Sequence, residues 1–262
     1  MTEATSGSGA SPLGSVDKAL LTLDALADAG AAGAPLAALA AAVGANKTTL
    51  HRTLAALRHR GYAEQTRDGA YRLGPAALAL GSTFLEEENL PALLHPALTA
   101  LSAETDELVH LGVLAGREIV YLDKVEPQRP VRVWSAVGRR SPAATTALGR
   151  ALLATQALDD AALARYAGSD TSPSHLRAVL DAARVQGFAA ETEENEPGIA
   201  CVAVAVVRAG HAVGAVSVTA PVERLTGEHR AARVAALREL LPRLLPGGLR
   251  VPGVERVREW AS

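Results

Sequence analysis

Three shortages in the sequence each exclude a class of protein. A single cysteine, Cys201, cannot close an internal disulfide, which argues against a disulfide-stapled secreted domain. Two Trp, four Tyr and two Phe residues are too few for a surface that stacks nucleic-acid bases on aromatic rings. No apolar run reaches about 18 residues, so no membrane-spanning helix and no membrane contact is expected.

The start of the chain lacks the features of a signal peptide. Residues 1–14 are rich in Ser, Gly and Thr, with neither a basic region nor an apolar one. We therefore expect a disordered N-terminus over 1–14 and a cytoplasmic protein. Apolar residues make up 48% of the 262 positions, which is enough for a sizeable core. At roughly 150 residues per domain, this length suggests two domains.

The apolar spacing after residue 14 predicts three helices, over about 15–30, 35–44 and 47–60. In the first helix, an i, i+4, i+7, i+11 stripe is expected to face the core, namely Val16, Leu20, Leu23 and Ala27. Asp68-Gly69, set between two short extended pieces, predicts a β-hairpin. Three helices and a hairpin within 60 residues indicate a winged helix-turn-helix over 15–74.

The third helix has a face suited to reading DNA. Leu50, Leu54 and Leu57 form a core stripe, while small and polar residues lie opposite or beside it, namely Thr48, Thr49, His51, Arg52, Ala55 and His59. Residues 46–72 carry six basic and two acidic side chains, a local charge of +4. Since the whole chain carries −2, the remainder is −6. The local cluster is what phosphate contacts require, and Arg67 at the hairpin tip is expected to touch a flanking phosphate or minor groove. The alternative is a helical hairpin whose basic residues only face solvent.

Gly74-Pro75 predicts a domain boundary, followed by a linker helix over 75–89, a mixed domain over 90–247 and a tail over 248–262. Within the mixed domain the sequence predicts strands over about 109–114, 119–125, 131–136, 188–191, 198–208 and 212–219. Helices are predicted there over about 145–155, 159–167, 174–186 and 226–244.

Several polar residues of this second domain could converge on a small ligand. Thr145 and Thr146 begin a helix, whose free N–H groups suit an anion. Glu191 closes a short strand, Cys201 lies in the next, and Ser217 and Thr219 share one face of the last. The alternative is that Cys201, within Ala-Cys-Val-Ala-Val, is a buried small hydrophobe and that Ser217 and Thr219 are ordinary strand residues. His110 is expected to be a hydrogen-bonded core histidine, and the acidic run Glu193, Glu194 and Glu196 a solvated loop.

The ordered motifs of the chain resemble those of the isocitrate lyase regulator (IclR) family of bacterial transcription factors. In the first domain these are Ser15-Val-Asp-Lys-Ala-Leu20, Asn46-Lys-Thr-Thr-Leu-His-Arg52, Gly61-Tyr62 and Tyr71-Arg-Leu-Gly74. In the second they are Val120-Tyr-Leu-Asp-Lys124, Val131-Arg-Val-Trp-Ser135, Val137-Gly-Arg-Arg140, Thr146-Ala-Leu-Gly-Arg-Ala151 and Glu193-Glu-Asn-Glu-Pro-Gly198. The resemblance extends from about residue 15 to 245.

The resemblance implies an α+β chain in which a winged helix-turn-helix domain is joined by a linker helix to a GAF-like effector domain. It implies a homodimer or tetramer on a near-palindromic operator of double-stranded DNA, and a small organic acid as effector. DNA contacts would fall on Asn46, Lys47, Thr48, Thr49, His51, Arg52 and Arg67. Effector contacts would fall on Thr146, Ala147, Leu148, Glu191, Cys201, Ser217 and Thr219.

The chain departs from the family pattern at a few positions. Ser141 and Ala144 replace a common leucine and histidine, and Glu191 stands where aspartate is frequent. Asn46-Lys47-Thr48-Thr49 replaces Pro-Lys-Ser-Thr. The identity of the effector and the operator sequence therefore do not follow from the resemblance.

Enzyme motifs are absent from the sequence. It has no Gly-x-Ser-x-Gly elbow, no Gly-x-Gly-x-x-Gly loop and no His-x-x-x-His spacing. We therefore predict a non-enzymatic regulator, most simply a repressor, without cofactor or metal. The alternatives are a small-molecule hydrolase or transferase with a helical N-terminal extension, and a pure interaction module that binds neither DNA nor ligand.

Overall fold

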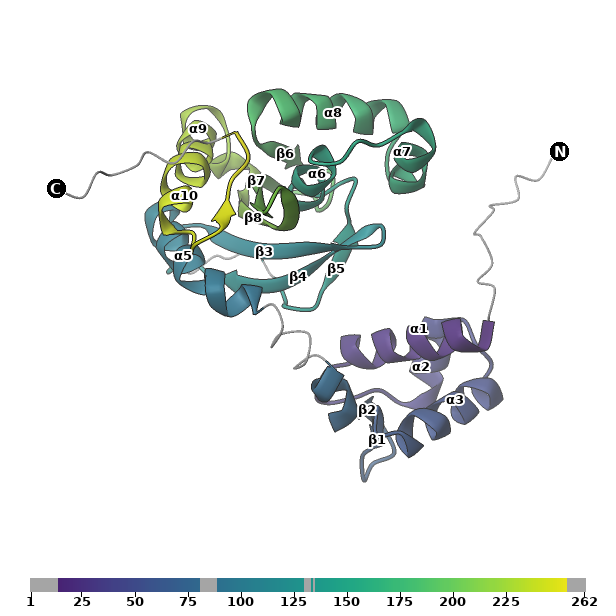
Figure 1. Ribbon diagram of the computed structural model, residues 1–262. Coiled ribbons are helices and arrows are strands. Elements are labelled where there is room, and N and C mark those ends of the chain that lie inside the picture. Colours follow the sequence, from purple (N-terminus) through teal and green to yellow (C-terminus); the bar gives the residue numbers. More distant parts are fainter. Residues whose placement is uncertain (1–13, 81–88, 130–132, 134, 254–262) are drawn as a thin grey trace. The chain divides into compact units, whose positions relative to one another are not determined.

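The computed structural model describes residues 14–80, 89–129, 133 and 135–253. The chain divides into two compact units, Met1–Asn89 and Leu90–Ser262, shown in Figure 1. Each unit has its own hydrophobic core. No helix within the described ranges is long and apolar enough to cross a membrane.

The first unit contains the predicted three helices and hairpin. They are α1 (Gly14–Asp28), α2 (Leu36–Val43), α3 (Lys47–His59), β1 (Ala63–Gln65) and β2 (Tyr71–Leu73). Gly44 ends α2 in the left-handed conformation, at φ 66°, which glycine adopts without steric cost. The hairpin pairs Ala63 with Leu73 and Gln65 with Tyr71. Residues 75–80 are also helical, and the rest of the predicted 75–89 helix lies largely outside the described residues.

The predicted inward face of α1 is wrong at three of its four residues, since of these only Leu23 packs against the core. Val16 and Leu20 are 51% and 56% exposed, and Ala27 is exposed as well. Thr22 and Leu26 are the buried residues instead. Thr22 can be buried because its hydroxyl donates to the Lys18 carbonyl at 2.6 Å, which satisfies the polar group within the helix. Apolar spacing alone could not detect a core position held by a threonine.

The second unit is built on an antiparallel sheet with the order β5-β4-β3-β8-β7-β6, to which β9 adds by pairing with β7. Its strands are β3 (Leu108–Ala115), β4 (Glu118–Val125), β5 (Arg140–Pro142), β6 (Ala189–Thr192), β7 (Ile199–Arg208), β8 (His211–Pro221) and β9 (Leu249–Arg250). Its helices are α5 (Leu90–Thr105), α6 (Ala147–Ala154), α7 (Asp160–Ala167), α8 (Pro173–Gln186), α9 (Gly227–Ala235) and α10 (Leu241–Leu244). A 3₁₀ turn covers Val222–Arg224, and a π-helical turn, Ala236–Leu240, joins α9 to α10.

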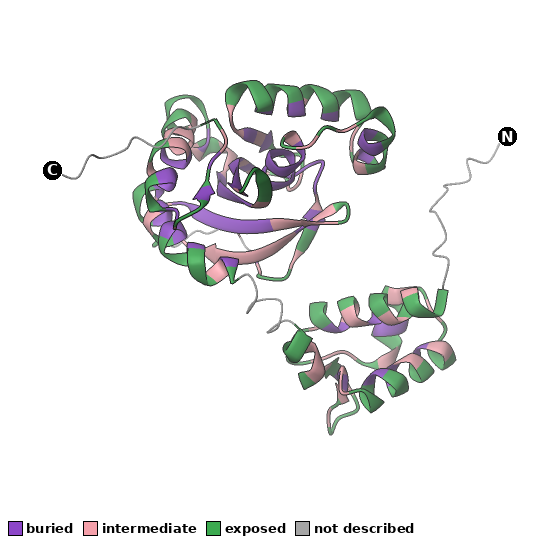
Figure 2. Cartoon of the chain, in the orientation of Figure 1, coloured by how far each residue is buried: buried purple, intermediate pink, exposed green. Residues whose placement is uncertain are grey.

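Helices cover both faces of this sheet (Figure 1). Side chains alternate between the faces of a strand. Val202, Val204 and Val218 point toward α5 and the C-terminal helices. Ala203 and Ala215 point toward α6 and α8. Figure 2 shows the resulting burial of the central strand β3. A mixed unit of sheet and covering helices, which follows a helix-turn-helix unit in the chain, matches the α+β class that the sequence predicts.

Three element predictions for the second unit differ from the structure. Of the predicted strand 131–136, the described residues 133, 135 and 136 belong to no strand, and the other three lie outside the described residues. The edge strand is β5 instead. The predicted tail at 248 begins with residues that pair with β7, and Val251 is buried in the core. The predicted helix 226–244 contains the π turn, in which the Leu241 N–H donates to the Ala236 carbonyl, and Pro242, which has no N–H, follows directly.

Candidate functional site

The outer face of α3 is open to solvent. Leu50, Leu54 and Leu57 are buried beneath it, as predicted. Lys47, Thr48, His51 and Arg52 are exposed along the first half of the helix, and Thr49 is half-buried. Arg67 is exposed in the 66–69 turn, which closes through a hydrogen bond from the Gly69 N–H to the Thr66 carbonyl at 3.0 Å. The predicted DNA-contact residues of helix and turn are therefore accessible on this unit.

Two features of this surface were not foreseen from the sequence. The side-chain oxygen of Asn46 accepts a hydrogen bond from the Thr49 N–H at 2.8 Å, so Asn46 caps α3. Arg72 pairs with Glu64 across the hairpin at 3.0 Å. The local excess of positive charge therefore includes one arginine that already has a carboxylate partner.

The predicted effector residues of the sheet lie on one face. Strand register pairs Glu191 with Cys201, Cys201 with Thr219, and Ser217 with His110. These residues belong to β6, β7, β8 and β3, which are far apart in sequence but adjacent in the sheet. The face they share is the one covered by α6, because the neighbouring Ala203 and Ala215 pack against that helix.

A chain of hydrogen bonds connects the polar groups of this face. Cys201 Sγ lies 3.2 Å from Thr219 Oγ1, and Thr219 Oγ1 lies 3.3 Å from His110 Nδ1. His110 Nε2 is 2.6 Å from Ser135 Oγ. The His110 ring also lies against the Tyr121 ring, with centroids 4.8 Å apart. The result is a nearly buried polar cluster within an otherwise apolar layer.

The first turn of α6 borders the same layer. Thr146 caps the helix, since its hydroxyl accepts from the Gly149 N–H and donates to the Pro142 carbonyl, each at 3.1 Å. Ala147 and Leu148 follow and are buried against the sheet. Thr146 thus orients the helix start and has its own hydroxyl engaged in doing so.

Burial shifts the pKa of each titratable group of the cluster in the direction that favours its uncharged form. It lowers the pKa of His110 to about 3, with the positive charges of Lys124 and Arg139 adding to the effect. It raises the pKa of the Glu191 carboxyl, against hydrogen bonds from Cys201 and from backbone N–H groups. It also raises the pKa of the Cys201 thiol, and the nearby Glu191 charge acts in the same direction.

Sequence reasoning missed several members of this region. His110 was expected as a hydrogen-bonded core residue, which is right, but not as a neighbour of Thr219. Tyr121, Ser135 and Arg150 lie within motifs that resemble the family, but nothing in the sequence assigned them a role in the site. The acidic run at 193–196 was expected to be a solvated loop, yet Glu194 forms an ion pair with the buried Arg150.

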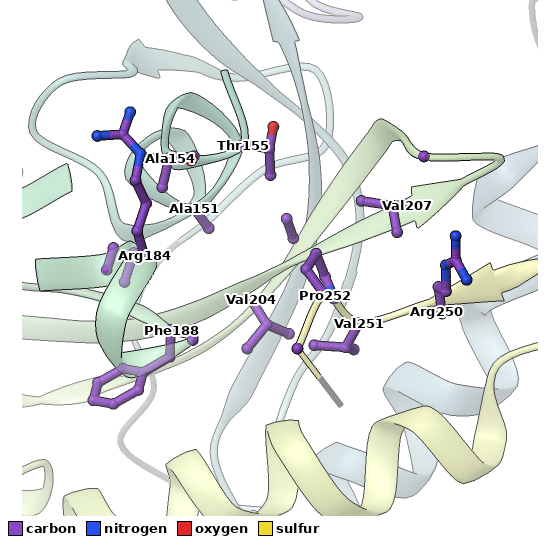
Figure 3. Close-up of a pocket in the computed structure, with 16 residues that line it drawn as sticks. Ala151, Ala154, Thr155, Arg184, Phe188, Val204, Val207, Arg250, Val251 and Pro252 are labelled. Atoms are coloured by element: carbon purple, nitrogen blue, oxygen red, sulfur yellow. Dashed lines mark hydrogen bonds between the residues drawn. The ribbon is translucent and has the colours of Figure 1, made fainter. Parts of the chain in front are cut away.

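A hollow of about 750 Å³ lies beside this region, at the edge of the sheet between β6 and β9. Figure 3 shows its mostly apolar lining, including Ala151, Phe188, Val204 and Val251. None of the predicted effector residues lines it. Among the residues that the structure describes, no group of three or more His, Cys, Asp or Glu side chains could hold a metal ion.

Comparison with known proteins supplies the family. Residues 15–67 match the IclR helix-turn-helix domain, and residues 82–241 match the C-terminal domain of the bacterial transcriptional regulator IclR. The HTH-type transcriptional regulator XynR of Escherichia coli K12 is 35% identical over 201 residues, which cover 73% of this chain and 79% of XynR.

Solved structures agree with this assignment. An IclR transcriptional regulator from Silicibacter sp. TM1040 is 26% identical, with a TM-score of 0.74 over 92% of this chain and 100% of that one. An IclR homolog from Microbacterium hydrocarbonoxydans, complexed with 4-hydroxybenzoate, is 22% identical and shares the fold, with a TM-score of 0.66 over 85% and 97%. The chain belongs to the IclR family of DNA-binding bacterial transcriptional regulators.

Proposed function

We propose that this regulator is a repressor that leaves its operator when a small organic acid binds to the second unit. The observation that carries the proposal is the convergence of Glu191, Cys201, Ser217 and Thr219 on one sheet face beside the start of α6. An acid, a thiol and two hydroxyls around a helix start suit a compact carboxylate. Thr146, Ala147 and Leu148 would contribute the helix side of the site.

The DNA-binding part of the proposal rests on α3. In a homodimer or tetramer, two copies of this helix would enter successive major grooves of a near-palindromic operator, about 34 Å apart. Thr48, Thr49, His51 and Arg52 would face base edges, while Lys47 and Arg67 would face phosphates. The capping bond of Asn46 leaves its side-chain NH₂ group for a further contact.

Control by the effector requires a difference in affinity between two arrangements of the subunits. The acid shifts the DNA-binding equilibrium only to the extent that it binds one arrangement more tightly. We propose domain limits of 15–74 for the DNA-binding part, 75–89 for the linker and 90–251 for the effector part. The last limit is extended from 247 because Leu249 and Val251 are core residues.

An enzymatic function is the second candidate, and it has a direct test. Turnover of a small organic acid by the purified protein would favour a hydrolase or transferase. The effector proposal expects binding of such acids without conversion.

Replacing Arg52 by alanine should weaken operator binding roughly 5- to 150-fold, because one good arginine contact to DNA contributes about 1–3 kcal/mol. A gel-shift titration of the full chain measures the effect. Arg165→Ala, which removes an exposed arginine from α7, is the matched control and should leave the affinity unchanged. Equal affinities for Arg52→Ala and the wild type would contradict the assignment of α3 as the recognition helix.

Replacing Cys201 by leucine should abolish the response to the effector, because the larger side chain fills the space beside Thr219 and removes a polar contact. Ser217→Ala tests the same face with a smaller change. A thermal-shift screen with acetate, pyruvate, succinate and 4-hydroxybenzoate identifies an acid that stabilises the wild type. A variant that still responds at the wild-type concentration of that acid would argue against the site. Far-UV circular dichroism of each variant checks its folding.

A further inference from the structure

Arg150 of α6 is a buried arginine that connects three separate segments. Its side chain is only 1% exposed. Nε donates to the Ala144 carbonyl at 2.8 Å, and Nη1 donates to the Ala190 carbonyl at 3.0 Å. Both terminal nitrogens bind the Glu194 carboxylate, at 2.8 and 2.5 Å. One guanidinium thus joins the turn before α6, the strand β6 and the loop that follows it.

Glu194 contacts both Arg150 and the predicted effector residue Glu191. While its carboxylate holds Arg150, its backbone N–H donates to Glu191 Oε2 at 3.2 Å. On the outer side the same carboxylate lies 3.2 Å from His175 Nε2 of α8. The position of the Glu191 carboxylate therefore depends on a residue that Arg150 fixes in place.

The loop that contains Glu194, residues 193–198, is compact and flanks the polar cluster. The Glu193 N–H donates to the Ile199 carbonyl and Glu193 Oε1 accepts from the Gly198 N–H, both at 2.8 Å. Farther along, Glu196 lies 3.6 Å from Arg139. The Glu196 charge contributes to the raised pKa of Cys201, which agrees with a loop that lies close to the thiol.

We propose that Arg150 is a positioning residue of the effector site: through Glu194 it orients the Glu191 carboxylate and holds the 193–198 loop closed beside Cys201. This inference rests on the proposed effector site. It adds that the Arg150–Glu194 pair controls access to Glu191 and Cys201. A bidentate arginine–carboxylate contact is directional and strong, and a buried guanidinium that loses its carboxylate partner is costly. Removal of the Glu194 charge should therefore favour an opened loop that admits water to Arg150.

The single cysteine of the chain allows a test that needs no effector. Cys201 is half-buried beside Glu191, so a thiol reagent such as dithionitrobenzoate reports how often the loop opens. In the full-length protein, Glu194→Gln should speed labelling at least tenfold, although glutamine has nearly the same shape. Glu194→Asp, which keeps the carboxylate, should restore most of the slow rate. Arg177→Gln, which removes an exposed ion pair with Asp160, should label at the wild-type rate.

The outcomes separate the positioning role from a merely structural one. Equal labelling rates for Glu194→Gln and wild type would overturn the proposal, since a space-filling role tolerates glutamine. If circular dichroism shows that Glu194→Gln is unfolded, Arg150→Lys replaces it, and an unchanged rate in that variant overturns the proposal equally. Because no acid is used, faster labelling supports the role of the pair even if no carboxylate binds. Binding of pyruvate with unchanged labelling would support the effector site and reject the pair.

Discussion

Alanine at position 149 should lower the stability of the second unit by about 3 kcal/mol, the upper end of the usual cost of overpacking. A Cβ built on Gly149 would lie 2.2 Å from the Ala143 carbonyl oxygen and 2.4 Å from the Ala143 Cα. Both are backbone atoms, so no side chain can rotate away to make room. The helix α6 would have to move off the turn at 142–146, which also carries the Thr146 cap.

Thermal unfolding measures this effect, and a loss of about 3 kcal/mol corresponds to a decrease in Tm of roughly 6–12 °C for a domain of this size. Gly247→Ala is the matched control, because a Cβ there has no neighbour within 4 Å. If Gly149→Ala had the same Tm as Gly247→Ala, the close contact between α6 and the 142–146 turn would be wrong. The displaced turn should also weaken any acid-induced stabilisation.

Acidification from pH 7.5 to 5.0 should remove about 2 kcal/mol of stability through His110 alone. Its pKa is about 3 in the folded protein, against about 6.5 when unfolded. The neutral form is therefore favoured by folding, and the stability it contributes is complete above about pH 6.5. That stability is lost as the pH falls toward 3, at about 1.4 kcal/mol per unit, because the unfolded chain binds the proton first.

The variant His110→Gln isolates this contribution. Urea unfolding at several pH values should show a shallower loss of stability than in the wild type, whereas His229→Gln, at an exposed position in α9, should follow the wild type. The raised pKa of Glu191 acts in the opposite direction, since its contribution is present at low pH and is lost as the pH rises. The Glu191 contribution is the same in the wild type and in His110→Gln. The difference between their stability curves therefore measures the contribution of His110. Parallel curves for wild type and His110→Gln would contradict the burial of a neutral histidine.

The sequence is sufficient to predict those elements whose structure depends on residues close together in the chain. The leucine stripe of α3, the glycine that ends α2 and the Asp-Gly hairpin follow from spacing and turn chemistry within a few residues. The face of α1 was not predictable in this way, because Thr22 is buried through a bond to its own helix. The edge strand at 140–142 was also missed, since three residues are too few for a period.

For the candidate site, the sequence alone suggested that Glu191, Cys201, Ser217 and Thr219 could meet, and the family resemblance made the suggestion specific. The sequence by itself determined the two-part organisation, the basic helix and the polar residues available in the strands. Only the tertiary structure decided that His110 joins Thr219 and that Arg150 reaches Glu194. The physical reason is that both contacts join residues far apart in the sequence. Antiparallel register brings His110 beside Thr219, about a hundred positions away, and the buried Arg150 guanidinium contacts Glu194, which no regular spacing relates to it.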